Sequence, residues 1–176
     1  MSAISLSGNH WEQKVKWYHG VAFFVLMHVL AAPWIQTPEY LNTQVKAPFA
    51  PPDWAFGPIW FLNTALMVYA GMLLLRKPVD APNRQTLIIL QIISWACFLI
   101  FGWTYFGLHS TILGSSITLI MFVVNLVSVI LGFKLDKRFS YTLIPLLVWL
   151  SVAAPVAVYQ ALYNHDELLR VGPFLS

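Results

Sequence analysis

Long apolar segments separated by short polar connectors dominate this sequence and restrict the folds open to it. A helix that crosses a membrane needs about 20 predominantly apolar residues, and it satisfies its backbone hydrogen bonds within itself. The sequence therefore predicts an all-α integral membrane protein with a single five-helix transmembrane bundle at residues 17–164. The expected helices cover residues 17–35, 58–75, 85–106, 112–133 and 139–162, between a polar N-terminal lead at residues 1–16 and a C-terminal tail at residues 165–176.

Charged residues are scarce, which excludes several classes of protein. They make up 10% of the chain, whereas soluble domains carry about 25%. The basic residues form no stripe interleaved with aromatic residues, so nucleic acid is not expected as a partner. Cys97 is the only cysteine, which leaves no internal disulfide and no cysteine-based metal site. No cleavable signal peptide is predicted at the N-terminus. The partner that composition predicts is the lipid bilayer.

Lysine and arginine are distributed unevenly over the connectors, which predicts the orientation of the helices. Eight of the ten lie at the N-terminus and in the second and fourth connectors, and the opposite side holds only Lys46 and Arg170. Because positive residues accumulate on the cytoplasmic side, the N-terminus is expected there. The first connector and the C-terminus are then periplasmic in a bacterial inner membrane. In a eukaryotic cell, the mitochondrial outer membrane is the expected host.

A proline- and tryptophan-rich segment at residues 47–60 follows the first predicted helix and contains four of the eleven prolines. We call the predicted connector, residues 36–53, the lid loop. Pro51 and Pro52 fix φ, remove two N–H donors and favour extended backbone before them. Asp53 is expected to cap the second helix, and Pro58 suits its first turn. The lid loop is thus predicted to be stiff and to deliver Trp54 and Trp60 to the membrane boundary.

Ionisable residues are almost missing from the predicted spans, which argues against proton pumping and catalysis. The sequence contains no nucleophile elbow, no zinc-protease motif and no paired carboxylates. No catalytic residue and no metal ligand is therefore predicted, and the protein is not expected to be an enzyme. His28 is the histidine well inside a span, and we interpret it as a hydrogen-bonded packing residue. The alternative is that His28 holds a haem as an axial ligand.

Aromatic and small side chains in the spans indicate either close helix packing or a ligand pocket. Trp95 and Trp149 lie well inside their helices, where the indole N–H needs a partner. Along the last helix, Trp149 is followed at steps of four by alanines at 153, 157 and 161, which suits close packing or a shallow wall for a flat ligand. Gln91 shares a helix face with Trp95. Aromatic rings with a few neutral polar groups suit a planar, amphipathic ligand. Ser128 and Gly132 form a further small-residue seam, for packing or for a dimer.

Residues 46–60 closely resemble the signature K-P-x-W-x-P-P-x-W-x-x-G-P-x-W of the TspO/MBR family, the translocator and tryptophan-rich sensory proteins. The family carries this segment between the first two of five helices. Further matches are Leu143, Pro145, Trp149 and Ala153 in the last helix, Gln91 in the third, and Phe106-Gly107 at its end. This chain departs from the pattern at Phe49, which replaces the first tryptophan. It also departs in the third helix, where Trp95 or Phe98 replaces an asparagine.

The resemblance implies a membrane receptor, sensor or carrier that binds porphyrins and similar planar hydrophobic ligands beneath the lid loop. Protoporphyrin IX or haem is the expected ligand, and no cofactor is required. In this hypothesis Trp149 stacks on the ligand, Trp54 closes the lid and Gln91 offers a polar contact. The implied ligand-binding residues are Phe49, Trp54, Trp60, Gln91, Trp95, Phe98, Trp149 and Ala153.

The resemblance leaves two alternatives and two expectations about partners. The alternatives are a membrane enzyme that acts on tetrapyrroles and a structural subunit of a larger membrane complex. A homodimer is expected. A sterol is disfavoured, because Arg170 lies too far after Tyr163 for the proposed cholesterol-recognition pattern.

Overall fold

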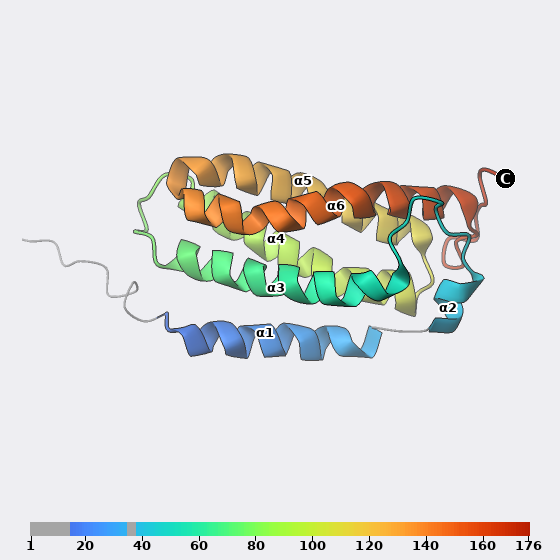
Figure 1. Cartoon of the computed structure of the whole chain (residues 1–176), viewed down its shortest axis with the longest axis horizontal. Helices are drawn as coiled ribbons and strands as arrows, with labels where there is room; N and C mark the ends of the chain where they lie inside the picture. Colours follow the sequence, from blue (N-terminus) through green and yellow to red (C-terminus); the bar gives the residue numbers. More distant parts are fainter. Residues whose placement is uncertain (1–14, 35–37) are drawn as a thin grey trace, which may run out of the picture.

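The computed structural model describes residues 15–34 and 38–176 as a bundle of helices that run side by side (Figure 1). The predicted polar lead up to residue 14 and the predicted end of the first helix at residue 35 lie outside the described residues. Within them, no strand is formed apart from an isolated bridge between Asp166 and Val171. The helices are α1 (Trp17–Ala31), α2 (Pro38–Thr43), α3 (Asp53–Leu75), α4 (Arg84–Gly102), α5 (Thr111–Leu135) and α6 (Lys137–Tyr163).

Four helices are long and apolar enough to cross a membrane: α3, α4 with its continuation to Gly107, α5 and α6. The predicted all-helical membrane bundle is confirmed to that extent. The helix α1 is apolar but has only 15 residues, about 22 Å at 1.5 Å per residue, which is less than the roughly 30 Å of a bilayer core. A 3₁₀ turn at Ala32–Trp34 extends it slightly. A fifth span therefore stays a prediction.

The start of α3 corrects the predicted boundary of the second helix. This helix begins at Asp53, five residues before the expected start at Pro58, which therefore lies inside the helix rather than in its first turn. Pro52 is the N-cap residue, with extended backbone (φ −56°, ψ 141°), so the cap predicted for Asp53 is wrong. The Asp53 carboxylate is instead paired with Lys46. The lid loop also contains the short helix α2, which begins at a proline, as first turns often do.

Helices α5 and α6 pack closely against each other near the turn that connects them. A Cβ atom added at Gly132 would lie 2.5 Å from the Phe139 ring and 2.6 Å from Ser140 Oγ, so only glycine fits there. Ser140 donates a hydrogen bond to the Val129 carbonyl at 2.8 Å. Ser128 is also buried, one turn before Gly132 on α5. The seam of Ser128 and Gly132 thus serves packing within one chain, which is one of its two predicted roles.

Asp136 joins three helices at the end of the bundle opposite the lid loop. Its carboxylate accepts from the Arg138 N–H at 2.8 Å, which caps α6, and pairs with Lys77 beyond the end of α3 at 2.6 Å. The hydrogen bond from Lys77 is the main reason why the pKa of Asp136 is below its usual value, and the Arg138 N–H adds to it against the effect of burial. The folded protein therefore favours the ionised carboxylate.

Acidification is expected to destabilise the fold through Asp136. The pKa of Asp136 in the folded protein lies below the unfolded value of about 3.9. The contribution of its ionised carboxylate to the free energy of unfolding is therefore complete above that pH, and it is lost as the pH falls through the folded pKa. Asp136→Asn keeps the cap but removes the charge. The loss of unfolding free energy between pH 7 and pH 3 should be smaller in this variant by up to about 1 kcal/mol. Thermal unfolding in detergent, followed by circular dichroism, measures this difference; equal slopes would contradict it.

Candidate functional site

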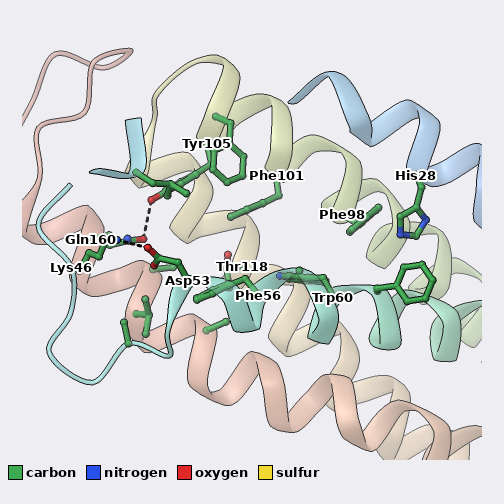
Figure 2. A pocket seen from close by; sticks show the side chains of 18 residues that line it. His28, Lys46, Asp53, Phe56, Trp60, Phe98, Phe101, Tyr105, Thr118 and Gln160 are labelled. Atoms are coloured by element: carbon green, nitrogen blue, oxygen red, sulfur yellow. Dashed lines mark hydrogen bonds and ion pairs between the residues drawn. The ribbon is translucent and has the colours of Figure 1, made fainter. Parts of the chain in front are cut away.

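A cavity of about 350 Å³ lies within the bundle beneath the lid loop (Figure 2). Its volume is within the range of about 300–1,000 Å³ that is usual for small-molecule sites. Residues from all six helices and from the lid loop contribute to it. Seven of its 18 lining residues are Phe, Tyr or Trp, namely Phe56, Trp60, Phe61, Phe98, Phe101, Tyr105 and Phe106.

Helical spacing explains why these rings face one another. Phe56 and Trp60 lie four residues apart on α3, and Phe98 and Phe101 lie three apart on α4, so each pair shares a helix face. The Trp60 and Phe98 rings both line the cavity, and their centroids lie 5.9 Å apart. After Gly102 the chain continues as a π-helical turn at Trp103–Gly107, which keeps Tyr105 on the cavity side. Such π turns occur often at functional sites.

Small side chains on α6 form the opposite wall. Ala153, Val156 and Ala157 line the cavity, and Gln160 follows one turn nearer its mouth. The predicted ladder of alanines therefore forms a wall with room for a ligand at residues 153 and 157. Ala161 is not among the lining residues. Pro155 lies inside α6 between these positions, and its missing N–H leaves one helical hydrogen bond unmade.

The mouth of the cavity carries its charged groups. Lys46 and Asp53 form an ion pair there, with side chains 40% and 60% exposed. The Tyr105 hydroxyl donates to the Gln160 side-chain carbonyl at 3.1 Å. Figure 2 shows Lys46, Asp53, Gln160 and Tyr105 together at one end of the cavity and His28 at the other. Lys46, Asp53 and Tyr105 therefore lie toward one end and His28 at the other, with aromatic rings and Thr118 between them (Figure 2).

His28 occupies the inner end of the cavity. Its Nδ1 atom lies 2.9 Å from the Phe24 carbonyl oxygen, and its Nε2 atom lies 3.3 Å from Thr64 Oγ1. The hydrogen-bonded state predicted for His28 is confirmed, and the residue lines the cavity as well. Its role as an axial haem ligand stays a prediction. Among the described residues, no three His, Cys, Asp or Glu side chains are grouped so that they would hold a metal ion.

The structure brings three of the eight predicted ligand-binding residues into the cavity wall: Trp60, Phe98 and Ala153. Trp54 is 76% exposed and does not line the cavity. Trp54 and Trp60 are six positions apart, so at 100° per residue their side chains differ in direction by about 240° around α3. Phe49 is also exposed, and its ring lies edge-on to Tyr159 with centroids 5.9 Å apart. The lid closure expected of Trp54 therefore has no support from this arrangement.

The other three predicted residues are buried between helices away from the cavity. Trp149 packs edge-on against Phe56, with centroids 5.0 Å apart, so Phe56 takes the cavity position that was expected for Trp149. Trp95 packs in the same way against Phe23 at 4.9 Å. Gln91 lies two turns before Phe98 on α4 and does not line the cavity. The structure therefore does not bring these three residues into the cavity wall, and their part in ligand binding stays a prediction.

Several lining residues were not predicted, although the sequence carries a signal for some of them. Phe101 and Tyr105 continue the helical spacing that starts at Phe98, and Phe56 precedes Trp60 by one turn. Extending the aromatic pattern by one turn along each helix would have identified them. Gln160 stands outside this aromatic pattern. Its pairing with Tyr105 depends on contacts 55 residues apart in the sequence.

The C-terminal segment holds the lid loop in place. Asn164 Oδ1 accepts from the Val45 N–H at 2.6 Å, and Asn164 Nδ2 donates to the Val45 carbonyl at 3.1 Å. Glu167 pairs with His109 at 2.8 Å, and the His109 ring stacks on Tyr40 of α2 with centroids 4.3 Å apart. We call residues 164–171 the C-terminal clasp. The predicted polar tail is thus a folded part of the outer end of the bundle (Figure 1).

Asp166 is the centre of the C-terminal clasp and is fully buried. Its carboxylate accepts from Ser110 Oγ at 2.7 Å, from the Ile112 N–H at 2.9 Å and from the Leu169 N–H at 2.8 Å. Burial alone would raise the pKa of the Asp166 carboxyl, but these hydrogen bonds together hold it below its usual value. The carboxylate also lies at the N-terminus of α5, where the helix dipole favours a negative charge.

Comparison with known proteins shows that the part of the chain that forms the cavity matches a known sequence family. The model of the TspO/MBR family matches residues 19–162, which include every residue that lines the cavity. The Tryptophan-rich protein TspO of Chlorobaculum tepidum is 27% identical over 138 residues, which cover 76% of this chain and 80% of that protein. The resemblance noted in the sequence is confirmed by both findings.

Proposed function

The chain belongs to the TspO/MBR family, and from this premise we propose that it is a membrane receptor or sensor whose cavity binds porphyrins and similar flat, hydrophobic molecules. Family membership supports the membrane sensor or receptor role. The observation that carries the ligand class is the cavity wall, in which seven aromatic rings surround a volume of about 350 Å³. Aromatic side chains favour stacked or edge-on contacts with another ring system, so they suit a planar ligand.

The two ends of the cavity suit an amphipathic molecule of this class. A tetrapyrrole would place its apolar ring system between Trp60, Phe98 and Phe101. Its carboxylates would remain at the mouth, where Lys46 offers a cation within a solvent-exposed ion pair. Its acidic edge would extend under the lid loop. The proposal is for binding rather than turnover, because the two charged lining residues, Lys46 and Asp53, pair with each other.

Two tryptophans on α3 provide a matched test of this proposal. Trp60 lines the cavity, whereas Trp54 is exposed outside it. Trp60→Ala is expected to weaken protoporphyrin IX binding roughly tenfold, because one large stacking surface is removed. Trp54→Ala is expected to change the affinity less than about twofold. The measurement is a titration of the purified protein in detergent, followed by the absorbance of the porphyrin.

Controls separate a lost contact from a lost fold. Each variant must remain monodisperse and keep its helical circular dichroism. Ala157→Phe fills the cavity from α6 without removing a ring, so it should also abolish saturable binding. The proposal fails if binding does not saturate in the native chain, or if Trp60→Ala and Ala157→Phe both bind as tightly as Trp54→Ala.

A further inference from the structure

The nitrogen atom of His28 that faces the cavity has a defined hydrogen-bonding state. Nδ1 lies 2.9 Å from the Phe24 carbonyl oxygen, and a carbonyl oxygen only accepts. Nδ1 must therefore carry the hydrogen and donate it to the preceding turn of α1. In a neutral imidazole, the other nitrogen then presents a lone pair. The tautomer of His28 thus follows from its backbone partner, and Nε2 is the acceptor.

Aromatic side chains surround the His28 ring. The Phe24, Phe61 and Phe98 rings lie with centroids 4.1, 5.9 and 5.9 Å from the His28 ring. Within the part of the chain that the structure describes, His28 has no ion-pair partner.

The hydroxyl nearest to Nε2 does not satisfy its lone pair. Thr64 Oγ1 is 3.3 Å from Nε2, but it is only 2.8 Å from the Trp60 carbonyl and 3.0 Å from the Phe61 carbonyl. A hydroxyl has a single hydrogen to donate, and a Thr in a helix commonly donates it to the carbonyl one turn earlier. The shorter contacts indicate that the helix carbonyls receive this hydrogen. Nε2 is left as an acceptor without a good donor at the inner end of an aromatic cavity.

We propose that His28 Nε2 is a recognition group that accepts a hydrogen bond from an O–H or N–H group at the inner end of the ligand. The cavity thus takes flat apolar molecules that carry a donor at the inner end, opposite the charged mouth. A half-buried acceptor that the ligand covers selects for such a donor, because a molecule without one leaves the acceptor unpaired. The inference deepens the proposed function and rests on it in one respect, namely that the cavity holds a ligand.

Two probes that differ only by methylation of the hydroxyl donor test the inference. The probes are 2-naphthol and 2-methoxynaphthalene, and their dissociation constants are measured by isothermal titration calorimetry in one detergent. The ratio of the two constants removes most of the difference in partitioning into micelles, since each probe is compared with itself across variants. The preference for the alcohol is expected to fall about three- to tenfold in His28→Phe, the usual effect of one neutral hydrogen bond.

Three variants separate hydrogen bonding from packing. His28→Gln keeps an acceptor oxygen and should retain part of the preference. Phe98→Leu removes a lining ring but no acceptor, so both affinities should fall and their ratio should stay constant. Thr64→Val removes the neighbouring hydroxyl and should leave the preference intact or increase it. Nitrogen-15 NMR of histidine-labelled protein reads the tautomer directly, with the His28 signals assigned from their loss in His28→Gln.

Several results would overturn the inference. These are an unchanged ratio in His28→Phe, no binding of either probe to the native chain, or a hydrogen on Nε2 in the NMR spectrum. A Soret shift with iron protoporphyrin that disappears in His28→Gln would instead assign Nε2 to metal coordination. Titration with protoporphyrin IX in parallel keeps the two proposals distinguishable. Saturable porphyrin binding with an unchanged probe ratio would leave the proposed function standing and overturn only the role of His28.

Discussion

Replacing Asp166 with alanine is expected to lower the free energy of unfolding by about 3 kcal/mol. Hydrogen bonds to a charged group contribute roughly 1.5–3 kcal/mol each, and buried donors that lose their acceptor are destabilising because water does not replace it. The carboxylate is fully buried and accepts from Ser110 Oγ and from the N–H groups of Ile112 and Leu169. Its loss leaves a buried hydroxyl and two N–H groups without their acceptor. It also removes the negative charge at the N-terminus of α5.

Thermal unfolding in a mild detergent, followed by circular dichroism, measures the effect of Asp166→Ala. Glu167→Gln is the matched control on the neighbouring residue, since that carboxylate is 57% exposed and its hydrogen bond with His109 should contribute little. Asp166→Asn keeps one acceptor oxygen and should fall between the two. If Asp166→Ala unfolded at the same temperature as Glu167→Gln, the buried hydrogen bonds would not stabilise the fold as we expect.

Replacing Gly132 with leucine is expected to destabilise the protein by about 3 kcal/mol or more through overpacking. Even the Cβ atom would lie 2.5 Å from Phe139 Cδ1 and 2.6 Å from Ser140 Oγ. Neither neighbour moves easily. Phe139 is almost completely buried, and Ser140 is held by its hydrogen bond to the Val129 carbonyl. The clash therefore has to separate α5 from α6 near their connecting turn.

A second helical glycine provides the control for this substitution. Apart from its own chain neighbours and the backbone of α3, no atom lies within 4 Å of a Cβ atom added at Gly71. Gly71→Ala should stabilise the protein by up to about 1 kcal/mol, because alanine favours a helix over glycine. Gly132→Ala gains the same propensity and should nevertheless be destabilising. Unfolding midpoints of the two alanine variants measure the contrast, and a stabilised Gly132→Ala would show that the α5–α6 contact is less close than described.

The sequence was sufficient to predict the helical bundle because membrane helices are specified by local composition and length. Each predicted span is a continuous apolar run, and polar connectors mark where it ends. The boundary of α3 was harder to predict, since Pro58 resembles a first-turn proline although the helix begins at Asp53. That error of five residues did not affect the helix itself. It did hide the fact that Trp54 and Trp60 point in different directions around α3.

The candidate site was predicted only in part because it depends on the level of each ring along its helix. Trp149 packs edge-on against Phe56 and does not line the cavity, whereas Ala153, one turn later on α6, does. The tautomer of His28 and the anchoring of the lid loop by Asn164 depend on contacts between atoms that periodicity does not describe. A polar C-terminal tail carries no pattern that would predict its fold.

The bond between Asn164 and Val45 joins residues that are 119 positions apart, and this separation has a consequence for the order of folding. Contacts between distant parts of a chain form late, because the intervening residues must first be made and ordered. While the ribosome is still synthesising α6, the lid loop has no anchor at Val45. The aromatic walls on α3 and α4 can already be in the membrane at that stage. The covered site is therefore among the last features of the protein to be completed during its biogenesis.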